Sequence, residues 1–236
     1  MTLGTNLLLQ WWSQNQCPYA SGMTLWVEAD SWSSTVWRNK APGAEYDLHV
    51  NSSMHAGVNG NAIVAPYNGA NMDVRADRNV VGTGSWSVEA VLSVANFSFA
   101  NYLMSQRTST ISPVADGQLQ AYVHTSGNVV VGAYHPAGTN VGANMTSVPL
   151  VAGSINSVAF GYDADSRKVW RVVNGVLAEN TDKDFSCNVN SFSLGNAMFT
   201  NSSFRGSLYS FRVWQRTLTS AELASNYAAD RRRFSF

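Results

Sequence analysis

Apolar residues in this sequence recur at every second position, in short runs that glycine and asparagine separate. The run from Leu119 to His124 is typical, because Leu, Ala and Val alternate with Gln, Tyr and His. A period of two places the apolar side chains on one face of a β-strand, whereas an amphipathic helix needs a period of 3.6. The pattern therefore predicts an all-β fold built from many short strands, as in a sandwich or barrel.

Two short turn sequences predict hairpins. Ser126-Gly127-Asn128 joins two alternating runs, and Asn174-Gly175 is the residue pair favoured in two-residue hairpin turns. One helix is expected near the C-terminus, where Thr219 and Glu222 form a capping box. The runs predict strands at 23–28, 46–51, 62–65, 86–94, 101–106, 119–125, 129–134, 154–162, 168–173, 191–194 and 207–214.

Charge and cysteine content exclude several classes of protein. The 236 residues carry 15 Lys and Arg against 15 Asp and Glu, and a neutral chain lacks the positive surface of a general nucleic-acid-binding protein. The longest apolar runs, such as Leu7 to Leu9, are too short for a transmembrane helix. No basic segment precedes them, so we expect no secretory signal. Cys17 and Cys187 allow one disulfide or a free buried pair, and do not suffice for a zinc site.

The chain divides into three expected parts, which are an arm at 1–20, one domain at 21–229 and a basic, aromatic tail at 230–236. No internal repeat or linker suggests a second domain. Exposed aromatic rings gain stability when they are buried against another surface. The residues expected to dock on partner subunits are therefore Trp11 and Trp12 in the arm and Phe234 and Phe236 in the tail.

Several segments resemble the concanavalin A-like lectin/glucanase superfamily, in particular its laminin G-like and pentraxin-like jelly rolls. The resemblance is carried by Ser157–Asp163, by Asn174–Leu177 and by Phe204–Leu223. Thr24–Asp30 and Ser85–Val91 extend it towards the N-terminus. It implies an antiparallel two-sheet jelly-roll sandwich with one short C-terminal helix. In the last strand the alternation of residues predicts that Tyr209, Phe211 and Val213 share one apolar face.

The glucanases of this superfamily use two glutamates and an aspartate that alternate on one strand, because the acid and base must flank the glycosidic bond. This chain offers Glu28-Ala29-Asp30 and lacks the second glutamate. We therefore predict no catalytic residues and no enzymatic activity.

Calcium is the ion that laminin G-like and pentraxin-like relatives bind, through oxygen ligands in loops. The paired acids on expected loops are Asp163 with Asp165 and Asp182 with Asp184. The alternative role of Asp163 is to cap a hairpin turn. The prediction is no bound cofactor and no metal site, with Ca²⁺ kept as an alternative that the resemblance implies.

Sugar recognition combines aromatic faces with polar groups that bond hydroxyls. The alternative role of Trp37 is structural rather than sugar-binding, because the residue at this position in the resembling family packs beneath a loop. The residues expected to form such a patch are Trp32, Trp37, Tyr67, Asn71 and Asp73.

Three hypotheses for function follow. The first is a non-catalytic jelly roll that serves, in many copies, as a structural or surface component of a large assembly such as a virion, suggested by the neutral surface and the aromatic ends. The alternative is a carbohydrate-binding lectin-like module, with or without Ca²⁺, whose partners are glycans. A β-glucanase is the least favoured because of the missing glutamate.

Overall fold

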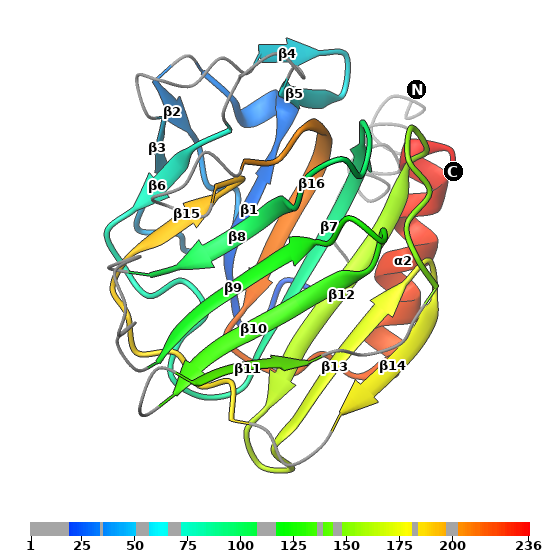
Figure 1. Cartoon of the computed structure of the whole chain (residues 1–236). Coiled ribbons are helices and arrows are strands. Elements are labelled where there is room, and N and C mark those ends of the chain that lie inside the picture. The colour runs from blue at the N-terminus through cyan, green and yellow to red at the C-terminus, as the bar shows by residue number, and fades with distance from the viewer. Residues whose placement is uncertain are drawn as a thin grey trace, which may run out of the picture.

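The computed structural model describes residues 19–33, 35–50, 57–65, 72–107, 117–135, 139–143, 148–180, 184–196 and 203–236. Two antiparallel sheets face each other, and one helix near the C-terminus lies beside them (Figure 1). The predicted jelly-roll sandwich with a single C-terminal helix is thereby confirmed. The division into arm, domain and tail stays a prediction, and Trp11, Trp12 and Cys17 lie outside the described residues.

Sheet A has the strand order β14-β13-β12-β7-β16-β5-β4, and β1 also pairs with β16. Its strands are β1 (Met23–Glu28), β4 (Gly57–Asn59), β5 (Ala62–Ala65), β7 (Trp86–Val94), β12 (Asn156–Asp163), β13 (Lys168–Val173), β14 (Val176–Asn180) and β16 (Gly206–Trp214). A single 3-10 turn, η1 (Ala29–Ser31), follows β1.

Sheet B has the order β11-β10-β9-β8-β15-β6-β3-β2. Its strands are β2 (Val36–Trp37), β3 (Leu48–Val50), β6 (Val74–Ala76), β8 (Asn101–Gln106), β9 (Gln118–Val123), β10 (Val129–His135), β11 (Thr139–Ala143) and β15 (Phe192–Leu194). Strands β1, β5, β7, β8 and β13 have the bounds that the alternation predicts.

The core lies between the two sheets, where the inward side chains of both meet. Phe192 of sheet B and Phe211 of sheet A have ring centroids 6.3 Å apart, and neither ring is exposed. Trp86 and Phe160, on paired strands of sheet A, meet edge to face at 6.2 Å. The indole N–H of Trp86 donates to the carbonyl of Phe185 over 2.9 Å. Burial of these rings fixes which face of each strand points inward.

Strand β16 departs from simple alternation. Its register against β7 shifts between Leu208 and Ser210, so Tyr209 is the extra residue of a β-bulge. Leu208, Phe211 and Val213 pack in the core, whereas the ring of Tyr209 packs against Phe234 at 5.6 Å. The prediction that Tyr209 shares the face of Phe211 and Val213 is therefore wrong, because the bulge moves it to the other face.

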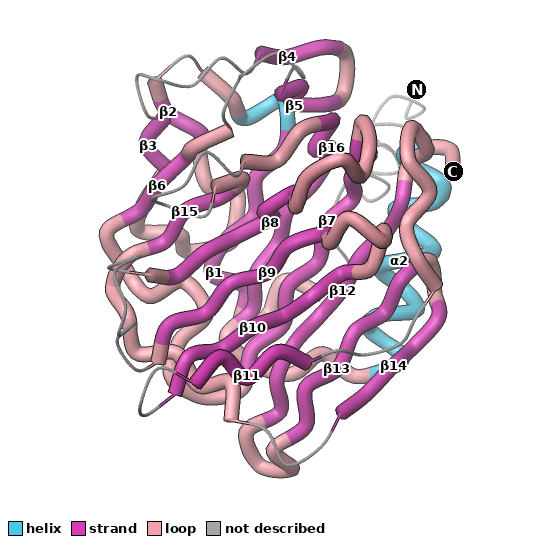
Figure 2. The backbone as a smooth tube through the Cα atoms, viewed as in Figure 1, coloured by secondary structure: helices cyan, strands magenta, loops and turns pink. Residues whose placement is uncertain are grey.

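Helix α2 (Ser220–Phe234) begins at the predicted capping box. The amide of Glu222 donates to the Thr219 hydroxyl at 3.2 Å, and the amide of Thr219 donates to the Glu222 carboxylate at 2.8 Å. The helix continues through Arg231, Arg232 and Arg233 and packs on the outer face of sheet A (Figure 2). Phe234 is only 8% exposed, because it docks within its own chain. Phe236 lies against Tyr227.

The Asn174-Gly175 turn also forms as predicted. Asn174 has φ of 49° and Gly175 has φ of 85°, and the turn joins β13 to β14. Both values lie in the left-handed region, which Asn and Gly tolerate best.

Gly206, at the start of β16, is a position where the backbone requires glycine. Its φ is 152°, and a Cβ atom there would collide with the carbonyl oxygen of Ser93. We expect Gly206→Ala to lower the free energy of unfolding by about 2–4 kcal/mol, since it combines backbone strain with a clash. Urea denaturation measures the change. Gly84→Ala is the matched control, because a Cβ at Gly84 meets no atom within 4 Å, and an equal loss in both variants would contradict the argument.

Candidate functional site

The outer face of sheet B carries the candidate site. On β9, Leu119, Ala121 and Val123 point into the core, so Gln120 and Tyr122 point outward. Within the described part of the chain, no helix crosses this face, whereas α2 lies on the side of sheet A (Figure 1). Polar and aromatic side chains on this face are therefore placed by the burial of their neighbours in the strand.

Five of these side chains form what we call the tyrosine cluster, which consists of Tyr102, Arg107, Gln120, Tyr122 and Tyr134. The rings of Tyr102 and Tyr122 stack with centroids 5.1 Å apart and an interplanar angle of 29°. The Arg107 guanidinium lies 5.0 Å from the centre of the Tyr134 ring. Arg107 donates to the Gln120 side-chain oxygen at 3.1 Å, and the Gln120 amide donates to the Tyr134 hydroxyl at 3.1 Å. These contacts join Tyr102 to Tyr122 across β8 and β9, and they join Arg107, Gln120 and Tyr134 across the end of β8, β9 and β10.

The cluster has a partly exposed rim and a buried floor. The three tyrosines are half-buried, whereas Arg107 and Gln120 are only 6% and 4% exposed. Next to them on β9, both polar side-chain atoms of Gln118 are buried, and the described part of the chain supplies no hydrogen-bond partner to either. A buried polar group without a partner is costly, and such groups point to a ligand or water.

Burial raises the pKa of Tyr102, and the nearby phenols of Tyr122 and Tyr134 raise it further, whereas Arg107 acts in the opposite direction. Burial and the Tyr134 phenol likewise raise the pKa of Tyr122. Both hydroxyls therefore stay protonated at neutral pH and can donate hydrogen bonds. Ring faces for the apolar side of a sugar, together with hydroxyl and amide donors for its hydroxyl groups, are the components of a carbohydrate site.

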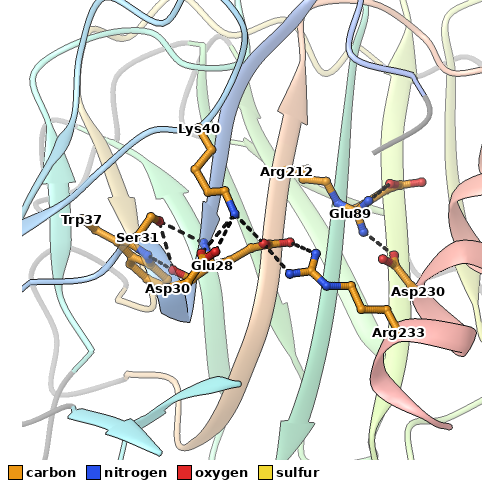
Figure 3. A network of polar contacts seen from close by, with 9 residues as sticks. All are labelled: Glu28, Asp30, Ser31, Trp37, Lys40, Glu89, Arg212, Asp230 and Arg233. Carbon is orange, nitrogen blue, oxygen red and sulfur yellow. Dashed lines mark hydrogen bonds and ion pairs between the residues drawn. The ribbon is translucent and has the colours of Figure 1, made fainter. Parts of the chain in front are cut away.

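A second polar group lies between the outer face of sheet A and α2 (Figure 3). Glu28 of β1 accepts from Arg233 of α2 at 2.5 and 2.8 Å and from Lys40 at 2.9 Å. Lys40 also bonds the exposed Asp30 at 3.0 Å. These contacts join the end of the helix to the first strand.

The other half of this network is centred on Arg212 of β16. Arg212 donates to Asp230 of α2 and lies 3.8 Å from the carboxylate of Glu89 on β7. Asn226 of α2 donates to Glu89 at 3.0 Å. Because these carboxylates lie beneath the helix and bond arginine or asparagine, the network attaches α2 to sheet A.

The network gives its two glutamates opposite pKa shifts. Burial disfavours ionised Glu28, but hydrogen bonds and charges of Arg233 and Lys40 outweigh burial and lower its pKa to about 2. Burial raises the pKa of Glu89, and the negative charge of Asp230 raises it further. Together they outweigh the opposite effect of the Arg212 charge and bring the pKa to about 7. Glu28 is therefore ionised at neutral pH, whereas Glu89 titrates near pH 7.

The residues predicted to bind sugar do not form one patch in the described structure. Trp32 and Trp37 meet edge to face at 5.3 Å, but Trp37 is fully buried and its indole N–H donates to the Glu28 carbonyl at 2.7 Å. Trp37 is thus a core residue, in line with its alternative role. Asp73 is 2% exposed and bonds Arg75 at 2.7 Å. Tyr67 and Asn71 lie outside the described residues.

Sequence analysis missed the tyrosine cluster, although a signal for it was present. The polar half of the alternating run at 118–123 includes Gln118, Gln120 and Tyr122, and these are the outward residues of β9. The alternation identified the strand, but it did not show that Tyr102 stacks on Tyr122 or that the Tyr134 hydroxyl bonds Gln120.

The acids considered for calcium have local roles where they are described. Asp163 accepts from the amide of Asp165 at 3.2 Å and from the hydroxyl of Ser166 at 2.6 Å, and so caps the turn after β12. Asp184 accepts from the amide of Ser186 at 2.9 Å. No group of three or more His, Cys, Asp or Glu side chains in the described ranges is arranged to hold a metal ion.

Two facing antiparallel sheets and a capped C-terminal helix make up this jelly-roll sandwich. The chain belongs to the concanavalin A-like lectin/glucanases superfamily, whose pattern matches residues 68–224. No curated protein matches the sequence.

Solved structures with a similar fold come from sialidases and their binding modules. The CBM40 of the Ruminococcus gnavus IT-sialidase, bound to α2,3 sialyllactose, has a TM-score of 0.53 and 18% identity, over 61% of this chain and 82% of that one. The Trypanosoma rangeli sialidase in complex with sialic acid has a TM-score of 0.64 and 13% identity, over 95% of this chain and 39% of that one. The leech intramolecular trans-sialidase has a TM-score of 0.53 and 19% identity, over 63% of this chain and 24% of that one. This chain thus covers less than half of the length of the Trypanosoma and leech enzymes.

These comparisons correct the first functional hypothesis. The prediction of a structural or decoration component of a virion is wrong, because the similar structures are sialidases and a sialidase carbohydrate-binding module. Among the described residues, no helix has both the length and the apolar character to cross a bilayer.

The opposite pKa shifts predict a stability maximum at mildly acidic pH. The free energy of unfolding should rise between about pH 2 and 4.5, because Glu28 ionises at a lower pH in the folded protein than in the unfolded chain. It should fall between pH 4.5 and 7, because folded Glu89 keeps its proton there and unfolded Glu89 does not. Urea denaturation at half-unit pH steps measures this profile.

Glu89→Gln is expected to reduce the decline above pH 4.5, since it cannot titrate and its amide oxygen can still accept from Asn226. The control is Glu179→Gln, which changes a glutamate that is 41% exposed and pairs with Lys168. A decline that persists unchanged in Glu89→Gln would assign it to another group.

Proposed function

We propose that this chain is a carbohydrate-binding module that binds glycans at the tyrosine cluster on the outer face of sheet B and does not cleave them. The observation that carries the proposal is the cluster itself, in which Tyr102 stacks on Tyr122 and Tyr134 contacts both Arg107 and Gln120. Aromatic rings backed by polar groups are the chemistry that a pyranose ring with its hydroxyls requires.

The arrangement is preorganised. Tyr134 is held by the hydrogen bond from Gln120 and by the Arg107 guanidinium over its ring, and Tyr122 is held by its stack with Tyr102. Side chains fixed before binding lose little conformational entropy when a ligand arrives, which favours affinity. The solved CBM40 with a similar fold binds sialyllactose, which supports a glycan as the ligand class.

The proposal of binding without hydrolysis rests on where the carboxylates lie. Retaining and inverting glycosidases need two carboxyl groups on either side of the scissile bond. Glu28, Glu89 and Asp230 instead lie under α2, and their partners are Arg233, Lys40, Arg212 and Asn226. The tyrosine cluster itself includes no carboxylate.

Tyr122→Ala is expected to weaken glycan binding at least about tenfold, equivalent to about 1.4 kcal/mol, because it removes one ring of the stacked pair. A glycan array with the purified chain identifies the glycans, with 3′-sialyllactose among them, and isothermal titration calorimetry measures the affinities. Binding should persist in EDTA, since the proposed contacts involve rings and hydrogen bonds and no metal.

The control is Tyr227→Ala, which removes a half-buried tyrosine from α2, beside sheet A. We expect it to leave glycan affinity within twofold of the wild type. Affinity that survives Tyr122→Ala, or that Tyr227→Ala reduces equally, would place the site elsewhere.

A further inference from the structure

Helix α2 is attached to the sandwich from outside. Among the described residues, the hydrophobic core between the two sheets includes none from α2. The buried residues of the helix are Asn226, Asp230 and Phe234, and Leu223 packs against a small separate cluster that includes Trp214. Segments with few buried apolar contacts are those that open locally before the rest of a protein unfolds. Departure of α2 from sheet A would thus leave the two sheets packed.

The polar contacts that attach α2 form an outer group and an inner group (Figure 3). The outer group consists of Glu28 with its two partners, Arg233 and Lys40. The side chains of these cations are 26% and 28% exposed, so water reaches both. Two cations to one buried carboxylate leave no excess of negative charge in the outer group.

The inner group consists of Glu89 of β7, Arg212 of β16 and Asp230 of α2, which are 6%, 3% and 5% exposed. Arg212 donates to Asp230 and lies 3.8 Å from Glu89, so one guanidinium serves two carboxylates. Asn226, which donates to Glu89, is uncharged. With both acids ionised, the inner group would hold one uncompensated negative charge away from water, which is costly. A proton on either acid removes that charge.

The other groups that face Glu89 do not supply a further cation. On β12, the residue paired with Glu89 is Ala159. On α2, Glu222 and Asp230 both add negative charge. Burial raises the pKa of Glu89 against the opposing charge of Arg212, and the pKa reaches about 7. Glu89 therefore holds its proton in the range where an exposed glutamate has lost it.

The surroundings of Asp230 act in the same direction. Burial raises its pKa, and the negative charge of Glu28 on β1 raises it further. Arg212 and Arg233 oppose this rise, but Arg233 is itself bonded to Glu28. Two neighbouring acids of this kind lose their protons as a coupled pair. The proton of the inner group thus belongs to Glu89 and Asp230 together.

We propose that α2 is a pH-dependent clasp, which opens from sheet A as a unit while the sandwich stays folded, and that the proton shared by Glu89 and Asp230 sets how often it opens. In the closed state the helix covers both acids. In the open state both face water. Opening also separates Phe234 from Tyr209, whose rings pack at 5.6 Å, and so uncovers an apolar surface on sheet A. The clasp is independent of the glycan site proposed on sheet B.

The direction of the pH effect follows from proton binding. Between about pH 4.5 and 7 the closed state holds a proton on Glu89 that the open state has released. Each unit of pH within that range therefore favours opening about tenfold. Glu28 stays ionised in both states over this range, because its pKa in the closed state is about 2.

Native-state hydrogen exchange of the full chain, read by mass spectrometry at pH 5, 6 and 7 in low concentrations of urea, tests the clasp. Labelling times are scaled to the intrinsic exchange rate at each pH. We expect peptides from α2 to open at least tenfold more often than peptides from β7 and β12, with little dependence on urea. Opening of α2 should rise at least tenfold from pH 5 to pH 7.

Two variants identify the proton. Glu89→Gln and Asp230→Asn each leave one carboxylate to the guanidinium of Arg212 and keep an oxygen that accepts hydrogen bonds. In each, opening of α2 should change less than threefold between pH 5 and pH 7. Glu179→Gln is the matched control, because it makes the same change at an exposed glutamate of β14, and it should retain the pH dependence of the wild type.

Exchange of α2 that requires as much urea as exchange of β7 and β12 would overturn the inference, because the helix would then open only when the whole chain unfolds. So would an opening of wild-type α2 that is the same at pH 5 and pH 7. Both results come from the wild type and decide even where a variant fails to fold. A wild-type pH dependence that persists in both folded variants would likewise exclude the shared proton as its cause.

Discussion

Burial of alternate side chains between the two sheets is the constraint on which the rest of this structure depends. Because strand side chains alternate with a period of two, a slip of one residue would move every core residue to the outside. The burial of Leu119, Phe192 and Val74 therefore fixes the outward positions of Gln120, Ser193 and Arg75. Burial of the inward residues is thus enough to place these polar side chains on the other face of sheet B.

The outer faces of the two sheets differ in what covers them, and the ion pairs of sheet A show the difference. On sheet A, the ion pairs of Arg212 and Glu28 hold α2 in place. Buried ion pairs add little net stability, but the loss of one partner is costly, so they specify where the helix docks. Sheet B carries no helix among the described residues. Its outward groups bond to one another within the face, and the three tyrosines of the cluster stay half-buried.

Much of the fold follows from local sequence, and the site does not. The hairpin at Asn174-Gly175 and the capping box at Thr219 were predictable, because each depends on a few adjacent residues. The bulge at Tyr209 was not, since nothing in the alternation indicates an extra residue. Nor was Arg171, which is 1% exposed at an inward position of β13, where the pattern predicts an apolar residue. The tyrosine cluster combines β8, β9 and β10, and only the paired register brings their side chains together.

Membership of the superfamily does not by itself determine whether a chain binds or cleaves a glycan, because function resides in sites placed on a shared fold. In this chain the distribution of carboxylates is the informative feature. Glu28 and Glu89 lie on the face that α2 covers, where Arg233 and Asn226 bond them. Asp73, on the side of sheet B, is bonded by Arg75 and Ser193. Asp73 therefore orients a guanidinium, and this role supports the proposal of binding without hydrolysis.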